Sequence, residues 1–187
     1  MYYDKKVAAL EAVLFAAGEP VAVSELADIL QMDKPQVWEL LSSLSQRCSA
    51  EDRGLMLREV AGGYQLVTKP EYYDMLSGLS RKKEVRLSNA AMETLSIIAF
   101  KQPVTRSEIE AIRGVKADGV VSTLLELELV EERGRKKVPG NPILYGTTEK
   151  FLNVFGLNSL KDLPVTEEDG EVGETEPDSV QQTLEME

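Results

Sequence analysis

Histidine is absent from this 187-residue sequence, and cysteine occurs once, at Cys48. Without histidine the chain cannot build Ser-His-Asp or Cys-His catalysis or a histidine-ligated metal site. A single cysteine cannot form an internal disulfide, which is typical of proteins of the reducing cytosol. We therefore expect a cytoplasmic protein with no metal, no cofactor and no enzymatic activity, in which Cys48 is a small, partly buried structural thiol.

Long apolar runs and nucleotide-binding motifs are also missing. Hydrophobic residues make up 43% of the chain, but no stretch approaches the roughly 18 apolar residues of a membrane helix. No apolar segment of a secretory signal follows residues 1–6. The chain has no phosphate-binding Gly-Lys-Ser/Thr loop and no GxGxxG after a predicted strand. We expect neither a membrane partner nor a small-molecule substrate.

Basic residues are absent from one end of the chain. Residues 166–187 contain nine acidic residues and no basic or aromatic one, which predicts a disordered acidic tail over 164–187. The rest of the chain holds 23 of the 32 acidic residues against all 21 basic ones, so its net charge is −2 out of a total of −11. Such a body is not held to DNA mainly by its own charge.

Residues 87–163 begin with two predicted helices. Ser88 is a predicted N-cap for the first, in which apolar residues recur at helical spacing, and Pro103 ends that helix. Thr105 opens the second, with Glu108 three residues later as a capping box.

A third helix is expected to begin at Asp118 and to turn three apolar residues toward the core, namely Val120, Leu124 and Leu127. Two extended segments follow, 129–133 and 143–148, joined by a loop rich in glycine, proline and lysine. Helix, helix, helix and hairpin is the order of a winged-helix domain.

The first 80 residues repeat this order. Helices are predicted over 6–17, from Ser24 to Leu30, from Asp33 to about Gln46 and over 70–79, with strands over 55–60 and 64–68. A shift of 83 residues aligns Val37, Leu41 and Leu44 with Val120, Leu124 and Leu127. We predict a mainly α fold with small β-hairpins, built from two tandem winged-helix domains, 1–80 and 87–163, joined by the basic linker 81–86.

The third helix of each domain is poorly suited to reading DNA, which requires Arg, Lys, Asn or Gln at the bases and phosphates. In the first domain basic residues stand only at the ends of this helix, and the segment 118–129 has none. Its surplus of apolar residues indicates either a protein partner or packing against the neighbouring domain. A dimeric winged-helix transcription regulator is the less favoured alternative.

Basic residues gather instead in the second predicted wing, at Arg135, Lys136 and Lys137. They form either a solvated hairpin tip or an auxiliary, sequence-independent contact with DNA, since phosphate contacts carry no base information.

Several segments resemble one bacterial family. The segment LSIIAFKQPVTR (95–106) is similar to the signature of segregation and condensation protein B, and EIEAIRGV (108–115) is similar to the segment that follows it there. The wing residues GRKKVPGNP (134–142) and LYGTT (144–148) extend the resemblance, and LFAAGEP (14–20) carries it into the first half. It covers roughly residues 5–164, with small departures at Phe100 and Asn141, and excludes the acidic tail.

The resemblance implies two winged-helix domains, a homodimer formed largely through the N-terminal ones, and a non-catalytic role in the condensin-like complex of SMC and its kleisin, ScpA. The kleisin would bind partly through the C-terminal domains, and ATP hydrolysis would belong to SMC. The protein would support chromosome condensation and partition during cell division, in the cytoplasm at the nucleoid. The candidate kleisin-binding residues are Phe100, Val121, Leu125 and Tyr145, and the candidate dimer residues are Tyr2, Tyr3 and Trp38.

Overall fold

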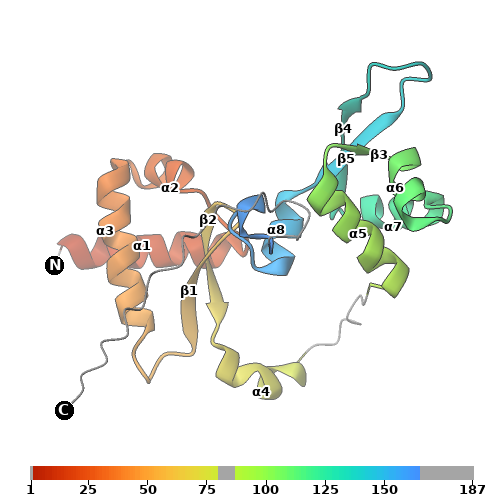
Figure 1. Ribbon diagram of the computed structural model, residues 1–187. Helices are drawn as coiled ribbons and strands as arrows, with labels where there is room; N and C mark the ends of the chain where they lie inside the picture. Colours follow the sequence, from red (N-terminus) through yellow and green to blue (C-terminus); the bar gives the residue numbers. More distant parts are fainter. Residues whose placement is uncertain (1, 80–86, 165–187) are drawn as a thin grey trace, which may run out of the picture.

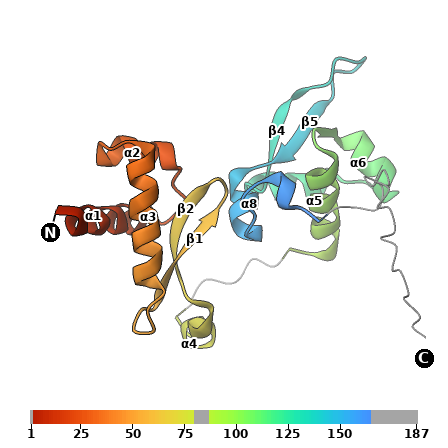
Figure 2. The ribbon, with the colours of Figure 1, turned by 60° about the vertical axis from the view of Figure 1, so that its left-hand side comes forward.

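The computed structural model describes residues 2–79 and 87–164, and of these the side chains from position 5 onward. The predicted linker 81–86 and the tail from 165 onward lie outside the described residues. We call residues 2–79 the first unit and residues 87–164 the second unit. Each has its own hydrophobic cluster, and Figures 1 and 2 show the units side by side, with the hairpin of the first facing α8 of the second.

The first unit contains three helices, a two-stranded antiparallel hairpin and a short helical end. Its elements are α1 (Tyr2–Ala17), α2 (Val23–Leu30), α3 (Lys34–Cys48), β1 (Leu55–Val60), β2 (Gly63–Thr68), η1 (Pro70–Tyr72) and α4 (Tyr73–Ser77).

Two helix starts in the first unit differ from the prediction. Helix α1 begins at Tyr2 rather than at residue 6, and Ala17 is exposed, although Val7, Leu10 and Leu14 form the buried stripe as expected. Helix α2 has Ala22 as its N-cap, so the prediction of Ser24 was wrong. The reason is tertiary: Val21 forms a β-bridge with Tyr64, with both N···O distances 2.9 Å, and the chain turns into the helix directly after it.

Helix α3 begins after Asp33, whose backbone N–H donates to Gln36 Oε1 at 3.1 Å. The helix runs to Cys48, two residues beyond the predicted end. Cys48 is buried, and this burial raises the pKa of its thiol. At the start of β2 Gly63 is required, because a Cβ there would lie 2.8 Å from the backbone of Val21. The helix predicted over 70–79 forms as η1 followed by the five residues of α4.

The second unit repeats the helix, helix, helix, hairpin order and adds a short helix at its end. Its elements are α5 (Asn89–Lys101), β3 (Val104–Thr105), α6 (Arg106–Arg113), α7 (Asp118–Glu126), β4 (Val130–Arg135), β5 (Ile143–Thr147), α8 (Glu149–Phe155) and η2 (Leu160–Asp162). The predicted hairpin is part of a three-stranded antiparallel sheet of order β3-β5-β4.

The predicted caps of α5 and α6 are confirmed. Ser88 Oγ accepts from the Ala91 N–H at 3.2 Å, and the Thr105 N–H donates to Glu108 Oε2 at 2.8 Å within a capping box. Gly114 ends α6 with a φ of 73°, the left-handed conformation that glycine adopts readily. The predicted fold class, mainly α with small β-hairpins in the winged-helix order, is confirmed.

The prediction for the buried face of α7 was correct at Leu124, but the most deeply buried side of the helix is rotated from the predicted one. Ala117, Val121 and Leu124 are buried, whereas Val120 and Leu127 are only partly buried. Ala117 is the N-cap and is completely buried, and its N–H donates to Glu110 Oε1 at 3.0 Å. Because the hydrogen bond to Glu110 holds Ala117 in the core at the start of α7, Val121 and Leu124, one and two turns later, also face the core.

Candidate protein-interaction surfaces

Helix α7 occupies the position of the DNA-reading helix of a winged-helix domain, and its surface charge is negative. Asp118 in its first turn is paired with Arg106 of α6, and Glu126 is exposed at its end. Glu128 follows the helix and is paired with Lys150 at 2.7 Å, which lowers the pKa of the Glu128 carboxyl. Helix α7 itself has no basic residue that could contact a phosphate, so it is unsuited to groove binding.

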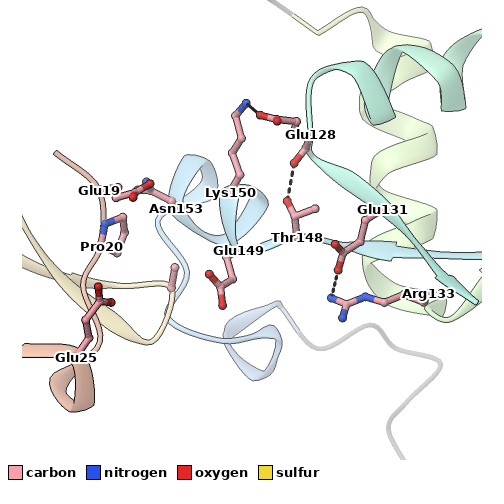
Figure 3. Close-up of a pocket in the computed structure, with 11 residues that line it drawn as sticks. Glu19, Pro20, Glu25, Glu128, Glu131, Arg133, Thr148, Glu149, Lys150 and Asn153 are labelled. Carbon is pink, nitrogen blue, oxygen red and sulfur yellow. Dashed lines mark hydrogen bonds and ion pairs between the residues drawn. The ribbon is translucent and has the colours of Figure 1, made fainter. Parts of the chain in front are cut away.

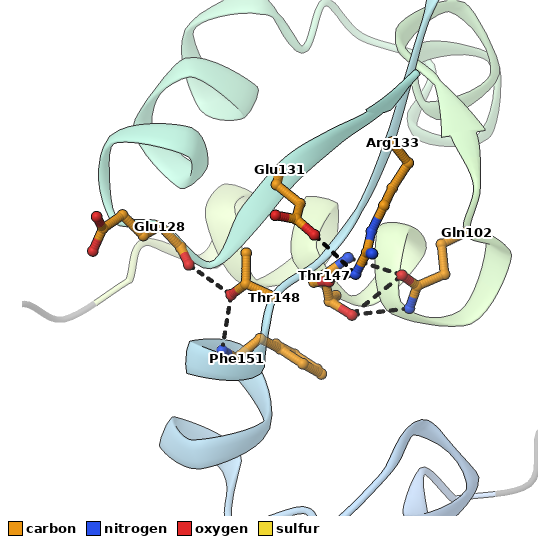
Figure 4. Close-up of polar contacts among 7 residues, drawn as sticks. All are labelled: Gln102, Glu128, Glu131, Arg133, Thr147, Thr148 and Phe151. Atoms are coloured by element: carbon orange, nitrogen blue, oxygen red, sulfur yellow. Dashed lines mark hydrogen bonds and ion pairs between the residues drawn. The ribbon is translucent and has the colours of Figure 1, made fainter. Parts of the chain in front are cut away.

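The base of the second wing is held by a polar network around Gln102, at the end of α5 (Figure 4). Gln102 Oε1 accepts from the Thr147 N–H at 2.8 Å, while Gln102 Nε2 donates to Ala99 O at 3.1 Å and to Thr147 Oγ1 at 3.0 Å. Arg133 Nη2 donates to Thr147 O at 2.7 Å and is paired with Glu131 at 2.9 Å. These contacts connect α5 to both strands of the wing.

The basic end of the wing is exposed, but two of its cations have partners in the chain. Lys136 Nζ lies 2.5 Å from Glu108 Oε1, and Arg135 Nη1 donates to Asn141 O at 3.0 Å. The Lys136 ammonium, together with the N–H and hydroxyl of Thr105, lowers the pKa of Glu108 to about 2. The wing is thus a positively charged surface that is partly neutralised by α6.

The two units meet through polar contacts between the hairpin of the first and α8 with the segment that follows it. Arg58 Nη2 donates to Asn153 Oδ1 at 2.7 Å, and the Ala61 N–H donates to Leu157 O at 2.9 Å. Asn158 accepts from the Gly62 N–H at 2.7 Å and donates to Glu59 at 3.0 Å. The hydrophobic clusters of the two units share no residue, and these hydrogen bonds join the units here.

A cleft of about 900 Å³ lies beside this junction (Figure 3). Its walls carry Glu19 and Glu25 from the first unit and Glu149 from the second, together with the Glu128–Lys150 and Glu131–Arg133 pairs. The cleft is therefore acidic, which suits neither an anionic ligand nor a nucleic acid.

A groove of about 350 Å³ runs between α3 and the hairpin of the first unit. The Trp38 side chain, which is 49% exposed, stands edge-on to the Tyr64 ring, with centroids 5.7 Å apart. Burial and a hydrogen bond with Glu59 raise the pKa of Tyr64 to about 12, so its hydroxyl stays protonated. Aromatic walls with a carboxylate at the rim suit a protein partner better than DNA.

No group of three or more potential metal ligands occurs within residues 2–79 and 87–164. In the same ranges no helix is both long and apolar enough to span a membrane.

Comparison with known proteins decides the family. The sequence model described as "Segregation and condensation complex subunit ScpB" matches residues 8–166. Segregation and condensation protein B of Moorella thermoacetica is 53% identical over 89% of this chain and 86% of its own length. The protein of the same name from Desulforamulus reducens is 46% identical over 94% of this chain and 97% of its own.

The chain belongs to the ScpB family. Among solved structures, a dimer of the ScpB N-terminal domain complexed with an ScpA peptide is 32% identical to it, covering 42% of this chain and 99% of that one with a TM-score of 0.41. The match of the sequence model and the two relatives confirm the family predicted from residues 95–115 and the wing.

Two of the four residues predicted to bind the kleisin are core residues of this ScpB-family chain. Val121 and Tyr145 are 1% and 2% exposed. Val121 is buried because α7 is rotated relative to the prediction, and Tyr145 because it lies on the covered side of the central strand β5. Neither offers a surface to a partner. Phe100 is 36% exposed at the end of α5, and Leu125 is partly buried.

The surplus of apolar residues on α7 is likewise explained by the core. Val120, Leu125 and Leu127 all pack against the hydrophobic cluster of the second unit, so the helix does not present a broad apolar face. Packing within the second unit thus accounts for the surplus, and neither a partner on α7 nor the neighbouring domain is needed to explain it.

Among the predicted dimer residues, Trp38 is half-exposed beside Tyr64. Tyr2 and Tyr3 begin α1, and their side chains lie outside the described part of the chain.

Exposed apolar residues on the first unit were missed by sequence reasoning. Phe15 on α1 is 73% exposed, and the helical end of the unit carries three more, Tyr73, Met75 and Leu79, at 65%, 69% and 76%. For the last three the sequence signal was the concentration of large apolar residues within the ten residues predicted as a helix, 70–79.

Proposed function

We propose that this protein is a non-catalytic subunit of a bacterial condensin-like complex of SMC and a kleisin. It acts as a homodimer, binds the kleisin ScpA and, through ScpA, associates with SMC. Its role is to support chromosome condensation and partition during cell division, in the cytoplasm at the nucleoid. The first unit provides the dimer contact and the second provides part of the kleisin-binding surface.

The observation that carries the proposal is the charge of the third helices in a chain of the ScpB family. Helix α7 presents Asp118 and Glu126 where a DNA reader presents basic residues. The corresponding surface of the first unit is the groove of Trp38 and Tyr64, with Glu59 at its rim. Winged helices with these surfaces are suited to protein contacts, which disfavours the operator-binding regulator.

Within the second unit, Phe100 is the better of the candidate kleisin contacts that reach the surface. It is a large aromatic side chain at the end of α5, and its exposed fraction of 36% leaves it available for an aromatic anchor contact. Leu125 is a secondary candidate, because most of its side chain packs on the core.

The wing residues Arg135, Lys136 and Lys137 provide an auxiliary contact with DNA in the assembled complex. Their exposure and charge support a weak, sequence-independent interaction, which the Glu108–Lys136 pair attenuates.

Titration calorimetry of the full chain with purified ScpA tests the proposal. We expect saturable binding that persists at moderate salt, and Phe100→Glu should weaken it at least about tenfold, as expected for an interface anchor. Met92→Glu is the matched control, because Met92 is an apolar residue of the same helix with a similar exposed fraction, 42%. Absence of ScpA binding by the unaltered chain, combined with tight binding of duplex DNA, would favour the regulator instead.

A further inference from the structure

The wing of the second unit carries the densest group of basic residues in the part of the chain that the structure describes. Four of the five residues 133–137 are basic, and all five are exposed. Figures 1 and 2 show the β4–β5 hairpin projecting beyond the helices of its unit. We call residues 133–137 the basic stretch; the hairpin presents its positive charge to solvent.

Two cations of the basic stretch have no carboxylate partner within the described residues. Arg135 Nη1 donates to a backbone carbonyl, Asn141 O, and the Lys137 side chain forms neither an ion pair nor a hydrogen bond within residues 5–79 and 87–164. Other basic residues of the second unit are paired with carboxylates, namely in Arg106–Asp118, Arg113–Glu93, Lys116–Glu110 and Lys150–Glu128. The basic stretch therefore keeps a surplus of positive charge that an anionic segment would compensate.

A segment of opposite charge follows the second unit in the same chain. Residues 167–178, which we call the acidic segment, contain seven acidic residues, whereas the last nine residues, 179–187, contain two. Neither stretch contains a basic residue. Val172 is the one hydrophobic residue of the acidic segment, so negative charge is the property by which this segment would bind a surface.

The chain is long enough to bring the acidic segment to the wing. The described residues end at Pro164, directly after Leu163, which packs on the hydrophobic cluster of the second unit. Val130, at the start of β4, belongs to the same cluster, and Arg135 at the end of the strand lies about 17 Å further along it. Residues 165–178 span up to about 50 Å when extended. The acidic segment is therefore within reach of the basic stretch of its own unit.

We propose that the acidic segment lies on the basic stretch of the wing in the same chain and competes there with the phosphates of DNA. Because the segment is tethered, its effective concentration at the wing is on the order of millimolar, so a weak contact suffices. The inference rests on the proposed auxiliary contact of the wing with DNA and adds its regulation, since DNA must displace the tail. The contact joins exposed charges, so salt weakens it.

Paramagnetic relaxation in NMR spectra of the full chain detects the contact directly. A nitroxide attached at Thr175→Cys should broaden the amide signals of residues 133–137 at low salt, and raising the salt to about 0.5 M should restore them. The native Cys48 is buried, and the unaltered chain treated with the same reagent controls for its labelling. A chain that also carries Arg135→Gln and Lys137→Gln should lose the broadening while keeping the Lys136–Glu108 pair.

Fluorescence anisotropy with a short duplex measures the competition. In the neutral-tail variant the glutamates of the acidic segment are replaced by glutamine and its aspartates by asparagine, changes that leave residues 5–164 unaltered. Its affinity for DNA should rise at least about threefold at low salt, because a larger fraction of wings is free. The same replacement in a chain carrying Arg135→Gln and Lys137→Gln should have a smaller effect, since only the general repulsion between tail and DNA remains.

The outcomes separate this inference from the proposed function. Unbroadened wing signals would overturn the tail contact, whether or not the wing binds DNA. Broadening confined to residues outside the wing, or seen only between a spin-labelled chain and a separate isotope-labelled one, would also overturn it. Equal effects of the neutral tail in both backgrounds would overturn the competition. Broadened wing signals in a protein whose neutral-tail variant does not bind DNA would support the tail contact and contradict the auxiliary DNA contact.

Discussion

The guanidinium of Arg58 in the first unit lies 2.7 Å from Asn153 Oδ1 in the second and 2.9 Å from Gln65 Oε1 in its own hairpin. Gln65 in turn donates to Gly18 O at 2.8 Å. One side chain thus links α8 to the hairpin and, through Gln65, to the end of α1. Such a contact gives the two units a defined orientation without a shared hydrophobic core.

Loss of this contact should loosen the junction and leave each unit folded. We expect Arg58→Ala combined with Asn158→Ala to broaden the distance between the units, since each hydrogen bond contributes only about 1 kcal/mol and few others remain. Spin labels at Gln46→Cys and Glu126→Cys, both exposed and on different units, report that distance by pulsed electron resonance.

Arg53→Ala is the control for this change, because Arg53 is an exposed arginine that lines a hollow built only from first-unit residues. A distance distribution that is unchanged in the junction variant would show that the orientation does not depend on these hydrogen bonds.

Gln102→Ala should destabilise the second unit by about 1–3 kcal/mol, because it leaves the partly buried Thr147 N–H without its acceptor. Gln46→Ala, at an exposed position on α3, should change the free energy of unfolding little. Urea denaturation followed by circular dichroism compares the two. Equal stability of both variants would contradict the role of Gln102 as the connection between α5 and the wing.

The pH dependence of the second unit should reflect Glu108. Its pKa of about 2 in the folded chain lies below the value of about 4.3 in an unfolded chain. As the pH falls, the unfolded state therefore takes up the proton first, so the stabilisation by Glu108 is complete above about pH 4.3 and is lost as the pH approaches 2. NMR titration of the Glu108 carboxyl carbon measures this pKa.

Lys136→Met should raise the pKa of Glu108 toward its ordinary value, because the ammonium group is the largest cause of its depression. Lys137→Met, at the neighbouring exposed lysine, is the control and should leave it low. An ordinary pKa for Glu108 in the unaltered chain would contradict the ion pair.

Changing Arg135, Lys136 and Lys137 to glutamate should weaken DNA binding and flatten its dependence on salt, because phosphate contacts release counterions. ScpA binding, measured in parallel, should be unchanged. Fluorescence anisotropy with a short duplex provides the measurement. Unchanged DNA binding by the triple variant would show that these wing residues do not contact DNA.

Local chemistry in the sequence predicted much of the second unit correctly. The side chains of Ser88 and Thr105 accept backbone hydrogen bonds of their own helices, so each cap follows from residues within one turn. The predictions that failed depend on distant residues. Ser24 lost its predicted role as a cap because Tyr64, in another element, pairs with Val21.

The burial of Val121, predicted to contact the kleisin, has the same kind of cause. Val121 is buried more deeply than Val120, and the start of the helix is held by the Ala117 N–H, which donates to Glu110, a contact that helical periodicity alone does not contain. Similarly, the exposure of Met75 and Leu79 depends on where Lys69 attaches η1 and α4 to the loop after α3. Periodicity shows that a helix has an apolar face, but tertiary contacts decide which residues are covered.

The most direct test of the account is size-exclusion chromatography with light scattering, run on the chain alone and after mixing with ScpA. We expect a dimer that elutes together with ScpA in one stable peak at moderately high salt. A chain that does not bind ScpA under these conditions, and instead binds duplex DNA tightly at low salt, would contradict its role as a kleisin-binding subunit.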